Sequence, residues 1–129
     1  MNVNLDISHT ISGQSHFKVL FNWNRELFIL NSIDILYVDF KNRVVTWHTD
    51  KKKYYTKVTI KSISNLLLTH GFFECYNGIL VNYNHIKSIT ENDIFLSNGL
   101  DLPISRRNRS ELVDNITSYS RSINDIVIN

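Results

Sequence analysis

Clustered basic side chains are the feature of this sequence that comes closest to a binding site. Over 129 residues, 14 Lys and Arg nearly balance 12 Asp and Glu, so the formal net charge is only +2. Residues 41–70 nevertheless hold seven basic side chains against one acidic side chain, and Arg106, Arg107 and Arg109 form a second cluster. Such clusters can bind the phosphates of a nucleic acid, and we expect Lys52 to make such a contact. A solvated hairpin whose lysines protect a sheet edge explains the first cluster equally well.

The residue patterns of enzymes and metal sites are missing from the sequence. It contains no Gly-rich phosphate loop, no His-Glu-x-x-His, no Cys-x-x-Cys and no Gly-x-Ser-x-Gly. Its five histidines show no ligand spacing, and Cys75, the single cysteine, can form neither an internal disulfide nor a thiolate cluster. We therefore expect no enzyme, no metal and no cofactor. Cys75 is expected to be a small, half-buried side chain rather than a redox site.

The length and punctuation of the chain predict one domain. A chain of 129 residues can bury a real core, and only four glycines and one proline interrupt it, so no linker is evident. We expect residues 1–15 to be a polar, frayed leader and residues 16–129 to form the domain. The sequence has no run of about 20 apolar residues and no signal-peptide plan, so we expect a cytoplasmic protein without membrane insertion.

Short β-branched and aromatic runs dominate the sequence from Phe17 onward, and this spacing is typical of an all-β domain. Asn98-Gly99 predicts a type I′ hairpin turn, and the charged residues 50–53 predict a second hairpin tip. Pro103 places its strand at a sheet edge or at the end of the strand. The predicted strands are 17–21, 25–30, 35–40, 43–48, 54–58, 79–81, 86–90, 94–96 and 100–104.

Two segments carry apolar residues at helical spacing instead. The first predicts a short helix over 60–69, with Gly71 beyond its end to supply a left-handed stop. The second predicts a C-terminal helix in the tail from Leu112 to Ile123. The expected N-caps are Thr59 for the first helix and Asn108 or Ser110 for the second.

Several separated motifs resemble the LytTR family of DNA-binding domains. The resemblance covers about residues 17–118. Its first motif is the acidic strand 33–39. It continues with a Gly-Phe at the end of the helix, a Val-Asn at a strand end, a hairpin and a final Ser-Arg. These motifs are Gly71-Phe72, Val81-Asn82, Asn98-Gly99 and Ser105-Arg106. The resemblance implies an elongated, mainly β fold of about ten strands in small sheets, with a short helix near 60–69 and a C-terminal helix.

The resemblance also implies that three loops read the major groove. The first maps to Lys41, Asn42 and Arg43, the second to Asn77, and the third to Arg106 and Arg107. Asparagine and arginine can bond the edges of adenine and guanine bidentately. Other readings stay open, because Asn77-Gly78 is also a common turn dipeptide and the two arginines could cap the preceding strand or begin the last helix.

These observations favour a sequence-specific transcription regulator over two other classes. The resemblance implies a bacterial transcription regulator, which we expect to stand alone without a receiver domain. Because one domain offers few base contacts, we expect a dimer on direct repeats in promoter DNA. A regulatory protein partner could supply its signal. The alternative is a protein-interaction module of the same fold that pairs with a related regulator. Glu74 and the near-neutral net charge favour that alternative. An enzyme is the third and weakest hypothesis.

Overall fold

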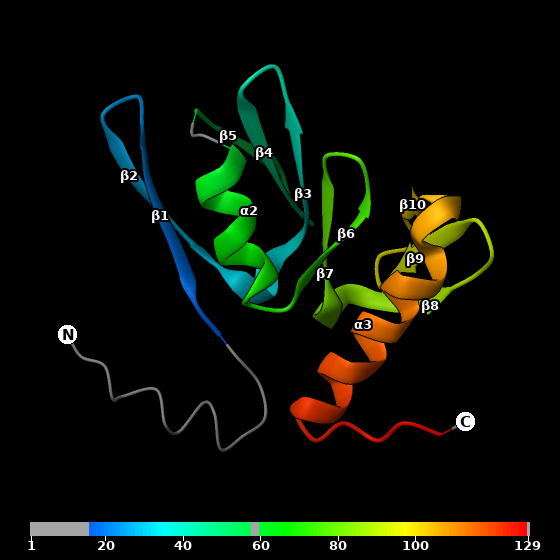
Figure 1. The fold of residues 1–129 in the computed structure, drawn as a ribbon. Coiled ribbons are helices and arrows are strands. Elements are labelled where there is room, and N and C mark those ends of the chain that lie inside the picture. Colours follow the sequence, from blue (N-terminus) through cyan, green and yellow to red (C-terminus); the bar gives the residue numbers. More distant parts are fainter. Residues whose placement is uncertain (1–15, 58–59, 129) are drawn as a thin grey trace.

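The protein is an elongated, mainly β molecule in the computed structural model, which describes residues 16–57 and 60–128 (Figure 1). Within these residues, ten strands form antiparallel sheets of two, five and three strands, which confirms the predicted fold class. The strands are β1 Lys18–Trp23, β2 Glu26–Asn31, β3 Ile35–Lys41, β4 Val44–Thr49, β5 Lys53–Thr56, β6 Phe72–Tyr76, β7 Ile79–Asn82, β8 Ile86–Ile89, β9 Asp93–Leu96 and β10 Asp101–Pro103. The helices are α2 Ile60–Leu68 and α3 Arg109–Ser122, with single 3-10 turns at η2 Ser32–Asp34, η3 Tyr83–His85 and η4 Arg106–Asn108.

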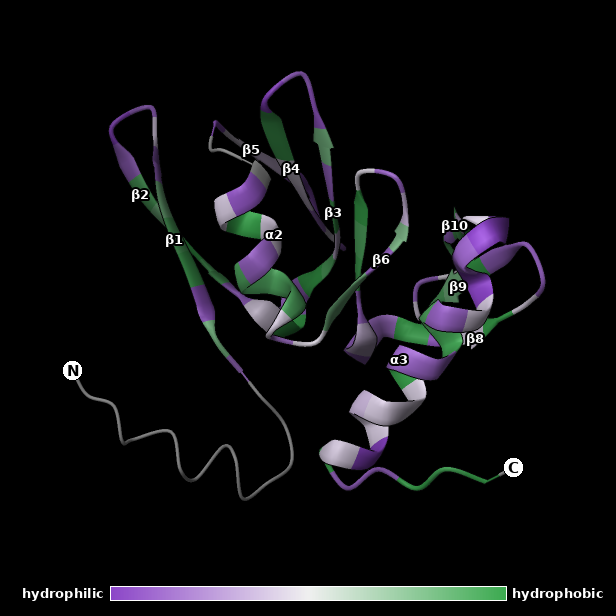
Figure 2. Ribbon diagram, viewed as in Figure 1, coloured by the Kyte–Doolittle hydropathy of each residue, from purple (hydrophilic) through white to green (hydrophobic). Residues whose placement is uncertain are grey.

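The five-stranded sheet, in the order β5-β4-β3-β7-β6, is covered on both faces. Val38 of β3 pairs with Leu80 of β7, and successive residues of a strand point to opposite faces, so Val38 and Val81 belong to different apolar clusters. The cluster of Val38 includes Leu30 from the β1–β2 hairpin and Leu67 from α2. The cluster of Val81 includes residues of β9 and Leu112 of α3. Hydrophobic strands therefore lie inside, and the hydrophilic hairpin tips project from them (Figure 2).

Both predicted helices are present. α2 ends at Leu68, and Gly71 has the left-handed φ of +85° that the sequence predicts. A Cβ added at Gly71 would lie 2.5 Å from the Tyr119 hydroxyl of α3, so this glycine also permits a close approach. Asn108 holds the N-cap position of α3 without a side-chain hydrogen bond, whereas Thr59 lies outside the described residues. Neither described helix is long and apolar enough to cross a membrane.

The strand predictions are right in place for nine strands and miss β6. Pro103 ends β10, the edge strand of the three-stranded sheet, as expected. In β6, Phe72 is buried on the α2 side, Cys75 is buried on the other side, and a register shift falls between Glu74 and Tyr76. A strand covered on both faces has no clean alternation of polar and apolar residues, so its signal in the sequence is weak.

The type I′ turn predicted at Asn98-Gly99 is wrong. Only Gly99 has positive φ, at +90°, and the Leu96 N–H donates to the Leu100 carbonyl at 2.8 Å, so the loop holds three residues. A three-residue hairpin loop combines a right-handed turn with one left-handed glycine. Positive φ at two consecutive residues occurs instead in the two-residue turns Asn24-Arg25 (51° and 64°) and Asn42-Arg43 (52° and 64°).

Candidate nucleic-acid interface

The β3–β4 hairpin presents the first group of predicted site residues. Lys41 and Val44 form the last strand pair, and Asn42 and Arg43 make the two-residue turn beyond it. Lys41, Asn42 and Arg43 are all exposed. A two-residue turn with left-handed residues matches the right-handed twist of the strands, so this tip is short and its side chains point away from the sheet.

The β6–β7 turn lies directly beside the β3–β4 tip. β3 pairs antiparallel with β7, and the Phe40 N–H donates to the Gly78 carbonyl at 2.9 Å. Asn77 precedes Gly78 in the turn and is exposed. The Gly78 N–H donates to the Glu74 carboxylate at 3.3 Å, which holds an acidic side chain next to Asn77. Asn77-Gly78 therefore forms a turn, and its geometry also leaves Asn77 exposed for a contact with DNA.

A third segment reaches the same place from the three-stranded sheet. The Ser105 N–H donates to the Cys75 carbonyl at 2.8 Å, two residues before Asn77. η4 follows at once and exposes Arg106 and Arg107. Arg109, the third arginine of this cluster, is held within the protein instead, because its Nε donates to the Thr90 carbonyl at 2.9 Å.

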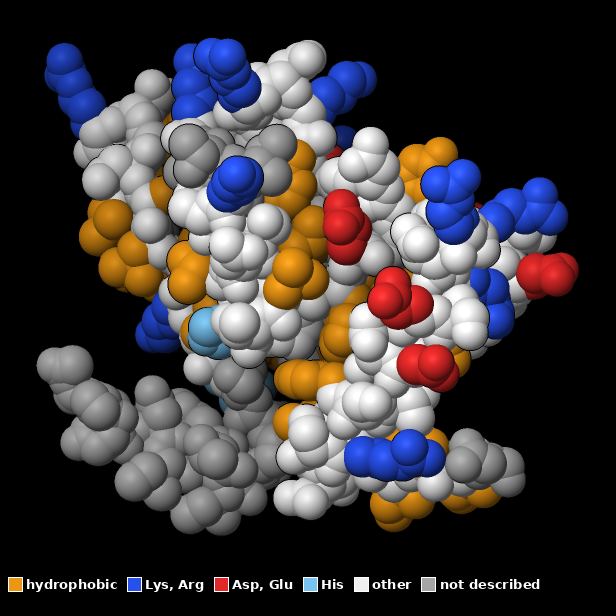
Figure 3. Space-filling model, in the orientation of Figure 1, with side chains coloured by type: hydrophobic (Ala, Val, Ile, Leu, Met, Phe, Trp, Pro, Cys, Tyr) orange, Lys and Arg blue, Asp and Glu red, His pale blue; other side chains and the backbone are white. Residues whose placement is uncertain are grey.

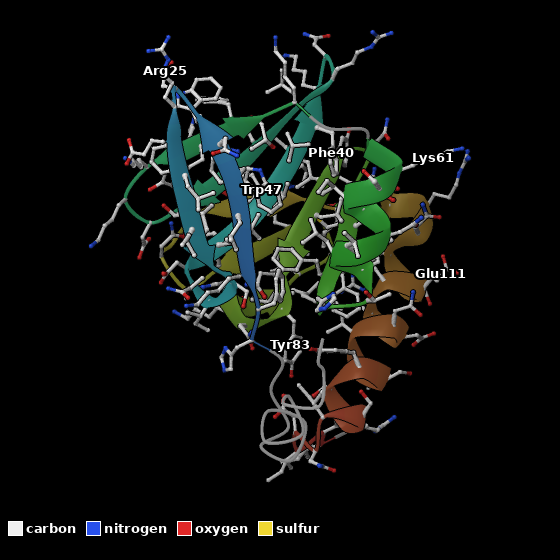
Figure 4. The ribbon with its side chains drawn as sticks, turned by 90° about the vertical axis from the view of Figure 1, so that its left-hand side faces the viewer. Arg25, Phe40, Trp47, Lys61, Tyr83 and Glu111 are labelled. Atoms are coloured by element: carbon white, nitrogen blue, oxygen red, sulfur yellow. The ribbon has the colours of Figure 1, made fainter. Side chains whose placement is uncertain are left out.

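These contacts gather every predicted site residue at one end of the molecule, which we call the tip surface. In Figure 1 the β3–β4 and β6–β7 tips point the same way, and Lys and Arg side chains gather mainly along this upper edge in Figure 3. Lys61 extends from the first turn of α2 near the same end (Figure 4). The tip surface comprises Lys41, Asn42, Arg43, Asn77, Arg106 and Arg107.

The lysines of the β4–β5 turn lie elsewhere, so Lys52, for which a phosphate contact is expected, lies apart from the other predicted DNA contacts. β4 runs from the tip surface to the opposite end of the sheet, which we call the base, and the turn 50–52 follows there beside η2 and η3. The Lys52 Nζ lies 5.0 Å from the Tyr54 ring centroid and 5.9 Å from that of Phe28. Neighbours in the sequence thus fall at opposite ends because one strand separates them.

Cys75 is a buried structural side chain rather than a reactive thiol. It is 1% exposed within the cluster under the three-stranded sheet, more deeply buried than expected. Burial, reinforced by the Glu74 carboxylate, raises the pKa of Cys75 to about 12. The thiolate, which is the reactive form, is therefore scarce at neutral pH.

A polar group that the sequence did not point to lies on the sheet between the two ends. The His48 Nε2 lies 2.5 Å from the Asp39 carboxylate, and the His48 ring stacks on Tyr37 at 4.0 Å between centroids. Burial of the imidazole lowers the pKa of His48, although the Asp39 hydrogen bond opposes that shift. The pairing of β3 with β4 brings these residues together, so no short sequence motif could have predicted the group.

Comparison with known proteins identifies the fold and the family. The sequence model of the LytTr DNA-binding domain matches residues 25–117. The chain belongs to the LytTR family of DNA-binding domains. LytTR domains are DNA-binding domains and not an enzyme family, so DNA is the partner that family membership supports.

A solved structure shares the LytTR fold. It is described as the LytTr DNA-binding domain of a methyl-accepting/DNA response regulator from Bacillus cereus, and its TM-score is 0.64 at 20% identity. The match covers 77% of this chain and 95% of that structure. No curated protein matches the chain.

Proposed function

We propose that this LytTR chain regulates transcription by binding a specific DNA sequence through the tip surface. The support is the pair of backbone hydrogen bonds, Phe40 to Gly78 and Ser105 to Cys75, that joins three separate segments at one end. Three short loops fixed to one another can enter a groove as a unit. The major groove is about 12 Å wide and presents a distinct pattern of donors and acceptors for each base pair.

The residues of the tip surface divide into two roles. Arg107 is the residue we assign to a guanine, since a guanidinium can bond both O6 and N7. Asn77 and Asn42 have amides suited to an adenine edge. Lys41, Arg43 and Arg106 are assigned to phosphates, which position the protein without reading sequence.

We also propose that two copies bind together on direct repeats. The tip surface offers few base-reading side chains, so one copy alone reads a short site. Repeats about 10–10.5 bp apart place two copies on the same side of the duplex. A regulatory protein partner and a cytoplasmic location belong to the same proposal, as they suit a promoter-binding regulator.

One observation favours a second function, a protein-interaction module of the same fold. The Glu74 carboxylate sits against the β6–β7 turn in the middle of the tip surface, where it repels phosphates. A module that pairs with a related regulator would tolerate this charge, and it would bind DNA weakly or not at all.

Selection of bound duplexes from a random pool separates the two functions. A regulator enriches one motif, arranged as repeats of one helical turn, and its affinity for that motif falls with salt at a log-log slope of about 0.9 per neutralised phosphate. A pool that stays random after selection, with wild-type chain shown to be folded, overturns the DNA-reading function and favours the interaction module.

A further inference from the structure

The β1–β2 hairpin carries the same turn as the β3–β4 hairpin. Asn24-Arg25 and Asn42-Arg43 are both Asn-Arg dipeptides, and their φ angles agree to within one degree at each position. Both turns are exposed, and each connects two antiparallel strands that are paired at six positions. β1 lies outside the part of the chain that matches the LytTR family, and the Asn24-Arg25 turn is not one of the three reading loops.

Arginine is an unfavourable residue at the second position of such a turn. A side chain with a Cβ is strained in the left-handed region, and glycine is the residue preferred there. Strained residues of this kind persist where the surrounding structure holds them, and they concentrate at functional sites. Two separate turns hold an arginine at this strained position, an arrangement that favours a role for the cation at each tip.

The Asn24-Arg25 tip points toward the same end as the tip surface. The base of its hairpin is anchored at the opposite end, because the Asn82 side chain at the end of β7 donates to the carbonyl of Ser32 at 3.0 Å. From that anchor, the six residues of β2 extend about 20 Å, nearly as far as the seven of β3. Figures 1 and 4 show both hairpin tips at the upper edge, with Arg25 projecting from it.

The hairpin is held firmly enough to present a side chain. Phe21 and Phe28 stack across β1 and β2 at 5.6 Å, and both rings contact Tyr54 of β5 at 6.0 and 5.6 Å. Val19 and Leu30 pack on the same cluster as α2. Arg25 itself makes no side-chain hydrogen bond or ion pair within the described ranges, so its guanidinium is available to a ligand.

We propose that the Asn24-Arg25 turn is a fourth DNA contact, in which Arg25 binds a phosphate of the duplex flanking the sequence read by the tip surface. This inference rests on the proposed DNA-binding function. It adds affinity without sequence information, because phosphates are the same at every base pair. The bound site is therefore longer than the sequence that is read.

Charge removal at Arg25 tests the contact. We expect Arg25→Gln to weaken binding about fivefold on a duplex carrying flanks of about one helical turn, and to reduce the salt slope by about 0.9. The selected motif stays the same. On a duplex trimmed to the motif, Arg25→Gln and wild type bind equally. Arg121→Gln is the matched control, since it removes an exposed arginine from the last turn of α3 and should change neither duplex.

A second variant separates strain from charge. Arg25→Gly relieves the left-handed strain, so it should raise the melting temperature while weakening binding to the flanked duplex as much as Arg25→Gln. Arg25→Lys keeps the charge and should bind nearly as wild type. The inference is overturned if Arg25→Gln binds the flanked duplex like wild type, or if its loss persists on the trimmed duplex. If the wild-type chain selects a motif but Arg25→Gln does not weaken binding, the proposed function stands and only the Arg25 contact is overturned. If the wild-type chain selects no motif, the proposed function and the Arg25 contact are both overturned.

Discussion

The tip surface and the base lie at opposite ends of the five-stranded sheet, and they use polar side chains in different ways. At the base, Asn82 donates to the carbonyls of Ser32 and Ile35, and the His85 ring contacts the Ile33 carbonyl and the Ser97 hydroxyl. The side chains of the tip surface make no hydrogen bond or ion pair to any residue in the ranges 16–57 and 60–128. Polar groups bonded internally hold a fold, whereas exposed polar groups without internal partners are available to a ligand.

This difference matters because charge along the sequence does not reveal it. Residues 41–43, with two basic side chains, and residues 51–53, with three, belong to one cluster in the sequence, yet the first segment lies at the tip surface and the second near the base. Substitutions at the base should therefore change stability, and substitutions at the tip surface should change DNA binding. Each of the following predictions tests one side of that division.

Asn82→Ala should have the largest effect, and on stability alone. The amide is buried, and its removal takes a buried donor from the carbonyls of Ser32 and Ile35, of which Ser32 keeps the bond from the Ile35 N–H. We expect a loss of about 2–4 kcal/mol in the free energy of unfolding, measured by urea denaturation. Asn84→Ala, at an exposed neighbouring position, is the control and should cost less than about 0.5 kcal/mol. Equal losses of unfolding free energy for the two variants would show that the Asn82 amide does not hold the base together.

Arg107→Ala should have the next largest effect, and on DNA recognition. We expect a loss of about 1–3 kcal/mol on the selected sequence, with relaxed preference at one base pair and an unchanged melting temperature. The measurement compares selected and scrambled duplexes at one salt concentration. Equal losses on both duplexes would show that Arg107 is a phosphate anchor, and a large drop in melting temperature would show that it is structural.

Lys52→Ala should leave DNA binding and its salt slope unchanged, in contrast to the arginines of the tip surface. Its ammonium lies over the Tyr54 and Phe28 rings near the base, so the variant should lose only about 0.5–1 kcal/mol of stability. Lys52→Arg keeps the contact and is the control. A salt slope lowered by about one in Lys52→Ala would place the β4–β5 turn on DNA and break the comparison of the two ends.

The smallest effect concerns pH and belongs to His48, between the two ends. Burial lowers the pKa of His48 in the folded chain below the unfolded value of about 6.5, so the unfolded chain takes up the proton first as pH falls. The stability gained from neutral His48 is therefore complete above about pH 6.5 and is lost as pH falls through the folded pKa. Urea midpoints between pH 7.5 and 5.5 should fall more steeply for wild type than for His48→Gln. The opposite slope would mean that pairing with Asp39 outweighs burial.

Much of the local structure could be predicted from the sequence. Period-two runs located nine strands, helical spacing located α2 and α3, Gly71 marked a left-handed stop, and Pro103 marked an edge. These features depend on backbone preferences and side-chain periodicity within a few residues of each other. β6 was not predicted because both of its faces are covered. The turn type predicted for Asn98-Gly99 was wrong because the loop length depends on where the strands stop pairing.

The sequence by itself determined which residue types stand at each turn, including Asn42, Asn77 and Arg107, whose contact with DNA stays a prediction. Only the tertiary structure decided that these turns meet. The β3–β7 pairing joins residues about forty positions apart, and the Ser105 contact with Cys75 joins residues thirty apart. The β3–β4 pairing places Lys52 at the base, and the packing of the β1–β2 hairpin on the cluster of Val38 directs the Asn24-Arg25 tip toward the same end as the others. Long-range pairing is set by the burial of whole faces against one another, and no short window of sequence contains that information.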